Sequence, residues 1–179
     1  RKLRPLWFRN QSWSHKEYII VWTLGKLADL EVQWALDLET LDLGNCYTGK
    51  KNRMHTGTSK EPLTALPKNI GKLCNLRTLF LNSNALTALP MEIGNLKKLK
   101  RLRLDKNRLR ELPETLGNLE NLEDLWLSEQ WQGFPPVKDW KRHRFSLPKS
   151  IGKLSKLRQL DLRKTLVSEL PEEIGKLSK

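Results

Sequence analysis

Long apolar runs and cysteines are both scarce in this sequence of 179 residues. No stretch approaches the ~18 apolar residues that suggest a membrane-spanning helix, so the sequence offers no candidate for one. The two cysteines, Cys46 and Cys74, form neither a disulfide framework nor a zinc-ligand pattern. We therefore expect an intracellular, cytoplasmic location, and secretion as a processed or effector protein stays open as an alternative.

Motifs for catalysis are lacking as well. His15, His55 and His143 lie far apart, and no nucleophile motif is present. The stretch GNCYTGKK, from Gly44 to Lys51, has the glycine and lysine spacing of a phosphate-binding loop. However, Lys51 stands where that loop needs Ser or Thr, and no helix-like periodicity follows. We predict no enzymatic activity, no metal site and no cofactor.

A repeat of 23 residues dominates what the sequence does contain. Five leucine–proline pairs recur at spacings of 23, 23, 35 and 23, and a glycine follows each proline after four residues. The pairs are Leu66-Pro67, Leu89-Pro90, Leu112-Pro113, Leu147-Pro148 and Leu170-Pro171. A fixed period in the twenties is the signature of a solenoid of stacked repeats.

Each period predicts a short strand followed by a turn and a helical segment. In LRTLFLNSN, Leu79 and Leu81 alternate with outward positions, which is typical of a strand with one buried face. Asn84 closes the strand, where its amide can satisfy backbone groups. A proline such as Pro67 can open a helical turn because the N–H that it lacks would be unpaired there. Each unit leaves an apolar face that only the neighbouring repeats can cover.

The repeats LPKNIGKLCNLRTLFLNSNALTA and LPMEIGNLKKLKRLRLDKNRLRE share the pattern LPxxIGxLxxLxxLxLxxNxLxx. This pattern resembles the 23-residue class of the leucine-rich repeat family, found in intracellular scaffold proteins and in bacteria. The resemblance is strong over residues 63–179. It implies an α/β solenoid of about five repeats, with a parallel sheet on the concave face and short helices or 3-10 turns on the convex face. It also implies a non-enzymatic protein-interaction module, without naming the partner.

The N-terminal part departs from the period. We assign residues 1–37 to an irregular cap that contains half of a degenerate repeat, and residues 38–179 to the repeats. The cap holds four tryptophans, Trp7, Trp13, Trp22 and Trp34, which could form a lid over the exposed end of the core; a binding role is the alternative. Because the chain begins RKLRPLWFRN, without methionine, and ends LPEEIGKLSK where the next strand should begin, we expect a mature fragment with a truncated or irregular end.

Two insertions interrupt the array, at about residues 47–61 and 131–142. Both follow the C-terminal end of a predicted strand. The first comes after the strand with Leu41 and Leu43, and the second comes after Gln130, which takes the asparagine position of its repeat. They should therefore leave the solenoid on the same edge, with roots about 15 Å apart for three strand spacings. Pro135 and Pro136 stiffen the second insertion, which we interpret as a side wall.

Aligned strands define columns across the concave face. The central column contains Asp42, Phe80, Arg103, Trp126 and Asp161. The column before it contains Thr40, Thr78, Arg101, Asp124 and Gln159, and the column after it contains Gly44, Asn82, Asp105, Ser128 and Arg163. Because Phe80 and Trp126 flank Arg103 on adjacent strands, we expect the guanidinium to stack between the two rings.

This stack is the predicted centre of a partner-binding site, because Trp and Arg are enriched at binding hot spots. Asp42, Asp161, Arg101 and Asp124 are the predicted polar contacts around it. The side wall would add Trp131, Phe134 and Trp140. Cover of Trp126 by one of the insertions is the alternative.

The net charge of +13 is distributed unevenly along the chain. Residues 111–130 carry −6, whereas residues 101–110 carry +4 and residues 141–160 carry +7. Solvated faces of a soluble solenoid would account for this pattern. The alternative to protein binding is binding of nucleic acid or another anionic surface through the basic–aromatic insertions. Its predicted basic residues are Lys50, Lys51, Arg53, Lys141, Arg142 and Arg144.

Overall fold

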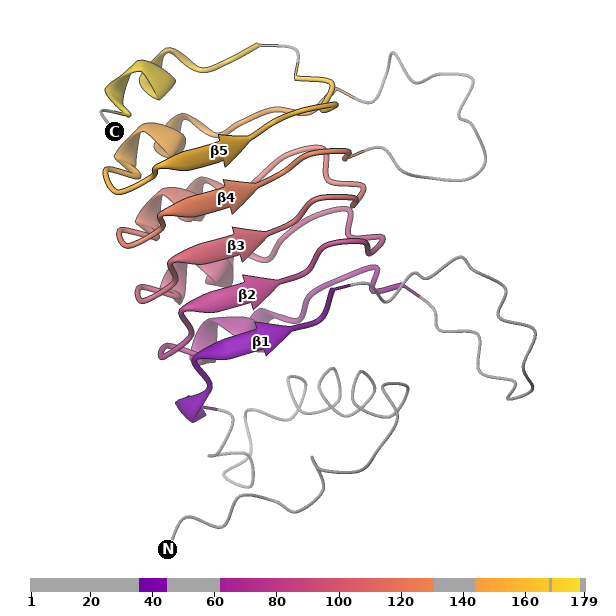
Figure 1. Ribbon diagram of the computed structural model, residues 1–179, viewed down its shortest axis with the longest axis vertical. Coiled ribbons are helices and arrows are strands. Elements are labelled where there is room, and N and C mark those ends of the chain that lie inside the picture. Colours follow the sequence, from indigo (N-terminus) through magenta and orange to yellow (C-terminus); the bar gives the residue numbers. More distant parts are fainter. Residues whose placement is uncertain (1–35, 45–61, 131–143, 168, 178–179) are drawn as a thin grey trace, which may run out of the picture.

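The computed structural model describes residues 36–44, 62–130, 144–167 and 169–177 (Figure 1). Most of the predicted cap and the two predicted insertions lie outside these ranges, as does Cys46. Among the helices of the described ranges, none has the length and apolar character needed to cross a membrane.

Five parallel strands form one sheet in sequence order (Figure 1). They are β1 (Thr40–Asp42), β2 (Thr78–Phe80), β3 (Arg101–Arg103), β4 (Asp124–Trp126) and β5 (Gln159–Asp161). Strands that pair in the sheet come from consecutive repeats, so each repeat adds one strand to an open sheet. The expected solenoid arc of about five repeats is confirmed.

Short 3-10 helices line the opposite, convex side. They are η3 (Lys68–Lys72), η4 (Met91–Asn95), η5 (Glu114–Asn118), η7 (Lys149–Lys153) and η8 (Glu172–Lys176). A proline in extended conformation precedes each of them; in the first, the Ile70 N–H donates to the carbonyl of Pro67 at 3.0 Å. Proline fits this position because the first turn of a helix leaves its N–H groups without intrahelical partners.

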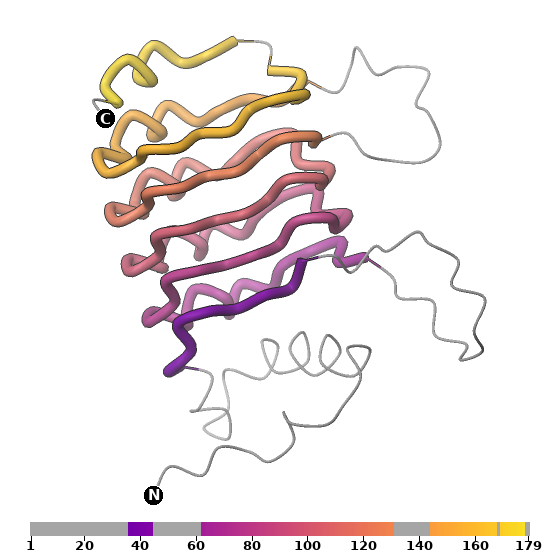
Figure 2. Tube along the Cα trace, viewed as in Figure 1, coloured from indigo at the N-terminus to yellow at the C-terminus, as the bar shows by residue number. Residues whose placement is uncertain are grey.

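The core lies between the sheet and the 3-10 helices, inside the coil that the chain follows in Figure 2. Its side chains are the leucines and isoleucines of the repeat pattern. Ile70, Leu73 and Leu76 are fully buried, as are Leu79 and Leu81 of the same repeat. Each repeat therefore supplies one layer of a continuous core, which is why the array is stable only as a stack.

Side-chain amides at one position of the repeat connect neighbouring repeats. The Asn84 amide donates to the carbonyls of Leu43 and Leu81 at 2.8 and 3.0 Å. Gln130 makes the equivalent bonds to Leu104 and Leu127 at 2.8 and 2.9 Å, as its alignment with the asparagines predicts. These amides satisfy carbonyl groups where the chain leaves the sheet.

The residue before this amide position adopts a left-handed conformation in four repeats. The positions are Ser83, Lys106, Glu129 and Lys164, with φ between 53 and 58°. None of them is glycine or asparagine, the residues that adopt this conformation most readily. The stacked repeats therefore hold a turn that the local sequence does not favour.

The described residues also show where the predicted insertions join the array. Gly44 follows β1 and Gln130 follows β4, so both junctions lie at the C-terminal ends of strands, with β2 and β3 between them. The repeat resumes at Phe145, whose side chain is buried and whose N–H donates to the Leu166 carbonyl at 2.9 Å. The array therefore continues across the 131–142 segment.

Candidate functional site

The strand register brings the predicted columns together. Arg103 is paired with Phe80 on one side and with Trp126 on the other, and the same row continues to Asp42 and Asp161. Leu102 and the equivalent leucines of the neighbouring strands, Leu79 and Leu125, are buried in the core. Because side chains alternate between the two faces along a strand, the row that contains Arg103 lies on the opposite, concave face.

Arg103 stacks between the two aromatic rings. Its guanidinium carbon lies 5.9 Å from the centroid of the Phe80 ring and 5.7 Å from that of Trp126. All three side chains are half-buried. Both distances are within the ~6 Å range of a cation–π contact.

Asp105 fixes the guanidinium from within the same strand segment. Arg103 Nε donates to Asp105 Oδ1 at 3.1 Å, and the Asp105 side chain is 10% exposed against 43% for Arg103. The buried carboxylate thus orients a cation that still reaches solvent. An arrangement held by its own neighbours loses little conformational entropy on binding a partner.

Asp161 differs from its prediction as an exposed polar contact. It is only 9% exposed, and its carboxylate accepts two hydrogen bonds of 2.9 Å from the Arg163 guanidinium. These bonds hold the pKa of Asp161 at about 2, below its usual 3.8. Of the two aspartates at the ends of the row, only Asp42 is exposed, and its Oδ1 accepts the Gly44 N–H at 2.9 Å.

Arg101 and Asp124 face each other across β3 and β4, in the column before the stack. Arg101 is exposed and Asp124 is half-buried. Thr78, in the same column, is 8% exposed and therefore offers little surface for contact. The polar border of the stack is thus formed by Arg101 and Asp124 on the side where the strands begin.

Sequence reasoning placed Asp105 and Arg163 in columns but missed the bonds that they form. In both cases an arginine and an aspartate stand two residues apart on one strand segment, Arg103 with Asp105 and Asp161 with Arg163. Side chains at that spacing project from the same face. The i, i+2 spacing of opposite charges was therefore an available signal.

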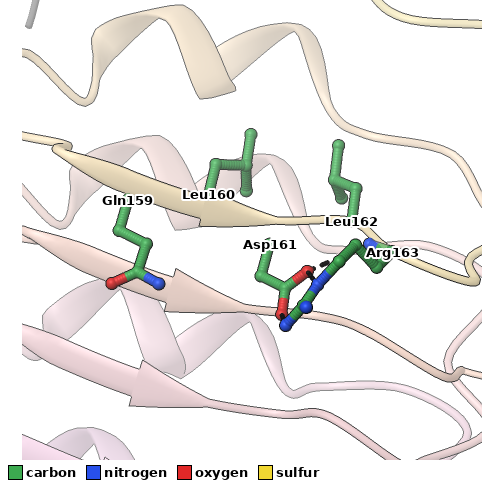
Figure 3. Close-up of a pocket in the computed structure, with 5 residues that line it drawn as sticks. All are labelled: Gln159, Leu160, Asp161, Leu162 and Arg163. Atoms are coloured by element: carbon green, nitrogen blue, oxygen red, sulfur yellow. Dashed lines mark hydrogen bonds and ion pairs between the residues drawn. The ribbon is translucent and has the colours of Figure 1, made fainter.

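A shallow hollow at the end of the sheet is lined by five consecutive residues, Gln159 to Arg163 (Figure 3). In the figure, Leu160 and Leu162 project to one side of the strand, whereas Gln159, Asp161 and Arg163 project to the other. Because a single strand segment lines this hollow, it lies at an open edge of the sheet and has no opposite wall. It does not have the enclosed shape of a small-molecule site.

The other predicted site residues fall mainly outside the described ranges. These are Trp131, Phe134 and Trp140 of the side wall, and Lys50, Lys51, Arg53, Lys141 and Arg142 of the basic alternative. Arg144 is described and exposed. The side wall and the anion-binding alternative therefore stay predictions. In the described ranges, no three His, Cys, Asp or Glu side chains gather closely enough to hold a metal ion.

Comparison with known proteins agrees with this architecture. A family model described as a leucine-rich repeat region matches residues 54–135. No curated protein sequence matches the chain.

Solved structures similar to the chain include proteins of bacteria and plants. A leucine-rich repeat protein of Leptospira interrogans is 30% identical with a TM-score of 0.52, over 80% of this chain and 36% of that one. A second similar structure is the leucine-rich repeat ectodomain of an Arabidopsis thaliana membrane receptor kinase, solved in complex with CASPARIAN STRIP INTEGRITY FACTOR 2. It is 38% identical to this chain with a TM-score of 0.52, and the match covers 63% of this chain and 13% of that one.

Internalin C2 of Listeria monocytogenes shares the fold, with 20% identity and a TM-score of 0.55 over 80% of this chain and 49% of that one. The chain thus spans less than half the length of each of these three proteins. The repeat pattern, the parallel sheet and these matches together show that this chain has the leucine-rich repeat fold.

Proposed function

We propose that this chain is a non-enzymatic module that binds a protein partner on its concave face. The Phe80–Arg103–Trp126 stack carries the proposal. Leucine-rich repeat domains serve protein–protein interaction, and the matched receptor ectodomain is bound to another factor in its structure. Both facts support a binding role without specifying the surface.

The position of the stack supports the concave face. Half-buried aromatic rings on the solvent side of a sheet contribute little to the core beneath them, which the leucines already fill. Two residue types of the stack, Trp and Arg, are enriched among the residues that dominate binding energy at protein interfaces. Arg101, Asp124 and Asp42 would add polar contacts at the border, and the 131–142 segment would form a side wall.

The test begins with a partner captured by this chain as bait and then purified. We expect Trp126→Ala to weaken binding to it by about 2 kcal/mol, the scale of a hot-spot residue, as measured by titration calorimetry. Met91→Ala is the matched control, because Met91 is a large apolar side chain, 67% exposed, on the convex face. Unchanged affinity of a folded Trp126→Ala variant would show that the concave stack is not the site.

A further inference from the structure

A second surface of the array lies at the edge where the chain enters the strands. Four turns form this surface, which we call the basic edge: residues 72–77, 95–100, 118–123 and 153–158. They occupy the side of the sheet from which the strand arrows begin in Figure 1, opposite to the ends where Gly44 and Gln130 lie. The basic edge is therefore distinct from the concave stack and from the predicted insertions.

Positive charge is concentrated on these turns. They contain eight basic and two acidic residues, a net charge of +6 in 24 residues, whereas the whole chain carries +13 in 179. The basic residues are Lys72, Arg77, Lys97, Lys98, Lys100, Lys153, Lys156 and Arg158. All of them are exposed except Lys100, which is half-buried.

Hydrogen bonds between repeats position lysine side chains along the edge. Lys98 Nζ donates to Asn75 Oδ1 at 2.8 Å, and Lys156 Nζ donates to Asn121 Oδ1 at 2.6 Å. Asn121 Nδ2 in turn donates to the carbonyl of Lys97 at 2.8 Å. Because these acceptors are neutral amides and carbonyls, the lysines are positioned without losing their charge.

Two of the lysines lie close to glutamates of the same edge. Lys100 lies 2.8 Å from Glu123, whose pKa is lowered by this hydrogen bond, and Lys97 lies 3.7 Å from Glu120. Outside the four turns, Glu39 lies 3.5 Å from Arg77. An excess of positive charge remains on the turns 72–77, 95–100 and 153–158, whereas the turn 118–123 carries two glutamates and no basic residue.

We propose that the basic edge docks on a phospholipid bilayer that contains acidic headgroups. Clusters of about four to eight Lys and Arg residues are attracted to such surfaces. Turns of equal length, stacked repeat upon repeat, give a continuous edge that can approach a membrane surface. The leucines of these turns are buried, so the contact would be electrostatic and would insert no side chain into the bilayer.

The composition of the edge favours lipid over other acidic partners. Its four turns contain no aromatic residue, whereas protein interfaces are enriched in aromatics and depleted in lysine. Single-stranded nucleic acids are held largely by stacking on aromatic side chains, which are also missing from these turns. Six of the eight basic residues are lysines, which act as hydrated point charges and not as bidentate forks for base recognition.

Vesicle sedimentation with the full chain tests the proposal. We expect binding to phosphatidylcholine vesicles that contain phosphatidylserine, no binding to pure phosphatidylcholine, and weaker binding as salt increases. The triple variant Lys98→Gln, Lys153→Gln and Lys156→Gln should lower the partition coefficient about 100-fold, from about fivefold per removed charge.

The matched control removes the same charge from the opposite edge, by Lys106→Gln, Arg108→Gln and Arg110→Gln. These three side chains are exposed, and their loss should leave vesicle binding nearly unchanged. Any of three results would overturn the proposal. These are equal losses of binding in the two triple variants, no binding of the chain to acidic vesicles, and release of the chain from the vesicles by duplex DNA. Thermal unfolding verifies that both variants are folded. Neither variant alters the concave stack, so the outcome is independent of partner binding there.

Discussion

Asn107 shows how much of the array rests on single side-chain amides. It is fully buried, and its amide nitrogen donates to the carbonyls of Leu81 and Leu104 at 2.9 Å each. Its side-chain oxygen accepts the Leu86 N–H at 3.1 Å. One residue thus satisfies backbone groups of two successive repeats.

We expect Asn107→Ala to lower the free energy of unfolding by about 1–3 kcal/mol, because it leaves the buried Leu86 N–H unpaired. The two carbonyls lose one hydrogen bond each but keep a second donor, Asn84 for Leu81 and Gln130 for Leu104. Urea unfolding followed by circular dichroism measures the change. Asn118→Ala is the control, since Asn118 is exposed at the end of η5 and its loss should cost less than about 0.5 kcal/mol. Equal stability of the two variants would contradict this role of the amide.

At the scale of the element, the glycine of each 3-10 helix permits the close stacking of repeats. A Cβ atom on Gly94 would lie 2.4 Å from the Thr115 carbonyl oxygen of the next repeat. The same approach, at 2.4 to 2.5 Å from a backbone oxygen, recurs at Gly71, Gly117 and Gly152. At Gly175, which no further described repeat covers, a Cβ would meet nothing within 4 Å.

This difference supplies a matched pair of variants. Gly94→Ala should destabilise the protein by about 1–3 kcal/mol, because the added methyl group forces two packed elements apart. Gly175→Ala should cost nothing, since the position is open and alanine is a better helix former than glycine. Thermal unfolding of both variants decides the point, and a loss of stability at Gly175 would contradict the packing explanation.

At the scale of the whole molecule, the array continues across the segment at residues 131–142, because the contacts that stabilise it run between equivalent positions of neighbouring repeats. Ser146 donates its N–H to the Arg110 carbonyl at 2.9 Å, and Glu111 and Ser146 form a parallel bridge. The end of the repeat that is interrupted at residues 131–142 is thus bonded directly to the end of the preceding repeat.

Deleting residues 131–142 restores the 23-residue spacing, so we expect the circular dichroism spectrum and the free energy of unfolding to stay within about 1 kcal/mol of the parent. Deleting residues 106–117, also twelve residues, should unfold the chain, because it removes the core side chains of Leu109, Leu112 and Leu116. If the segment is a side wall, the first deletion also weakens partner binding. A large loss of stability after the first deletion would show that the segment supports the fold.

The sequence by itself determined the period, the strand register and the face on which each side chain lies. Leucines and prolines repeated at a fixed interval leave one way to bury the apolar positions, which is to stack each unit on the previous one. The pairing of Phe80, Arg103 and Trp126 in one row follows from that register alone.

Only the tertiary structure decided how side chains of different repeats pair. It joined the Lys98 and Lys156 ammonium groups to asparagines of neighbouring repeats, and it holds Lys106 in a left-handed backbone conformation. A pattern within one repeat cannot specify these features, because each depends on the rotamers and the distance of a neighbour that the chain reaches only 23 or more residues later.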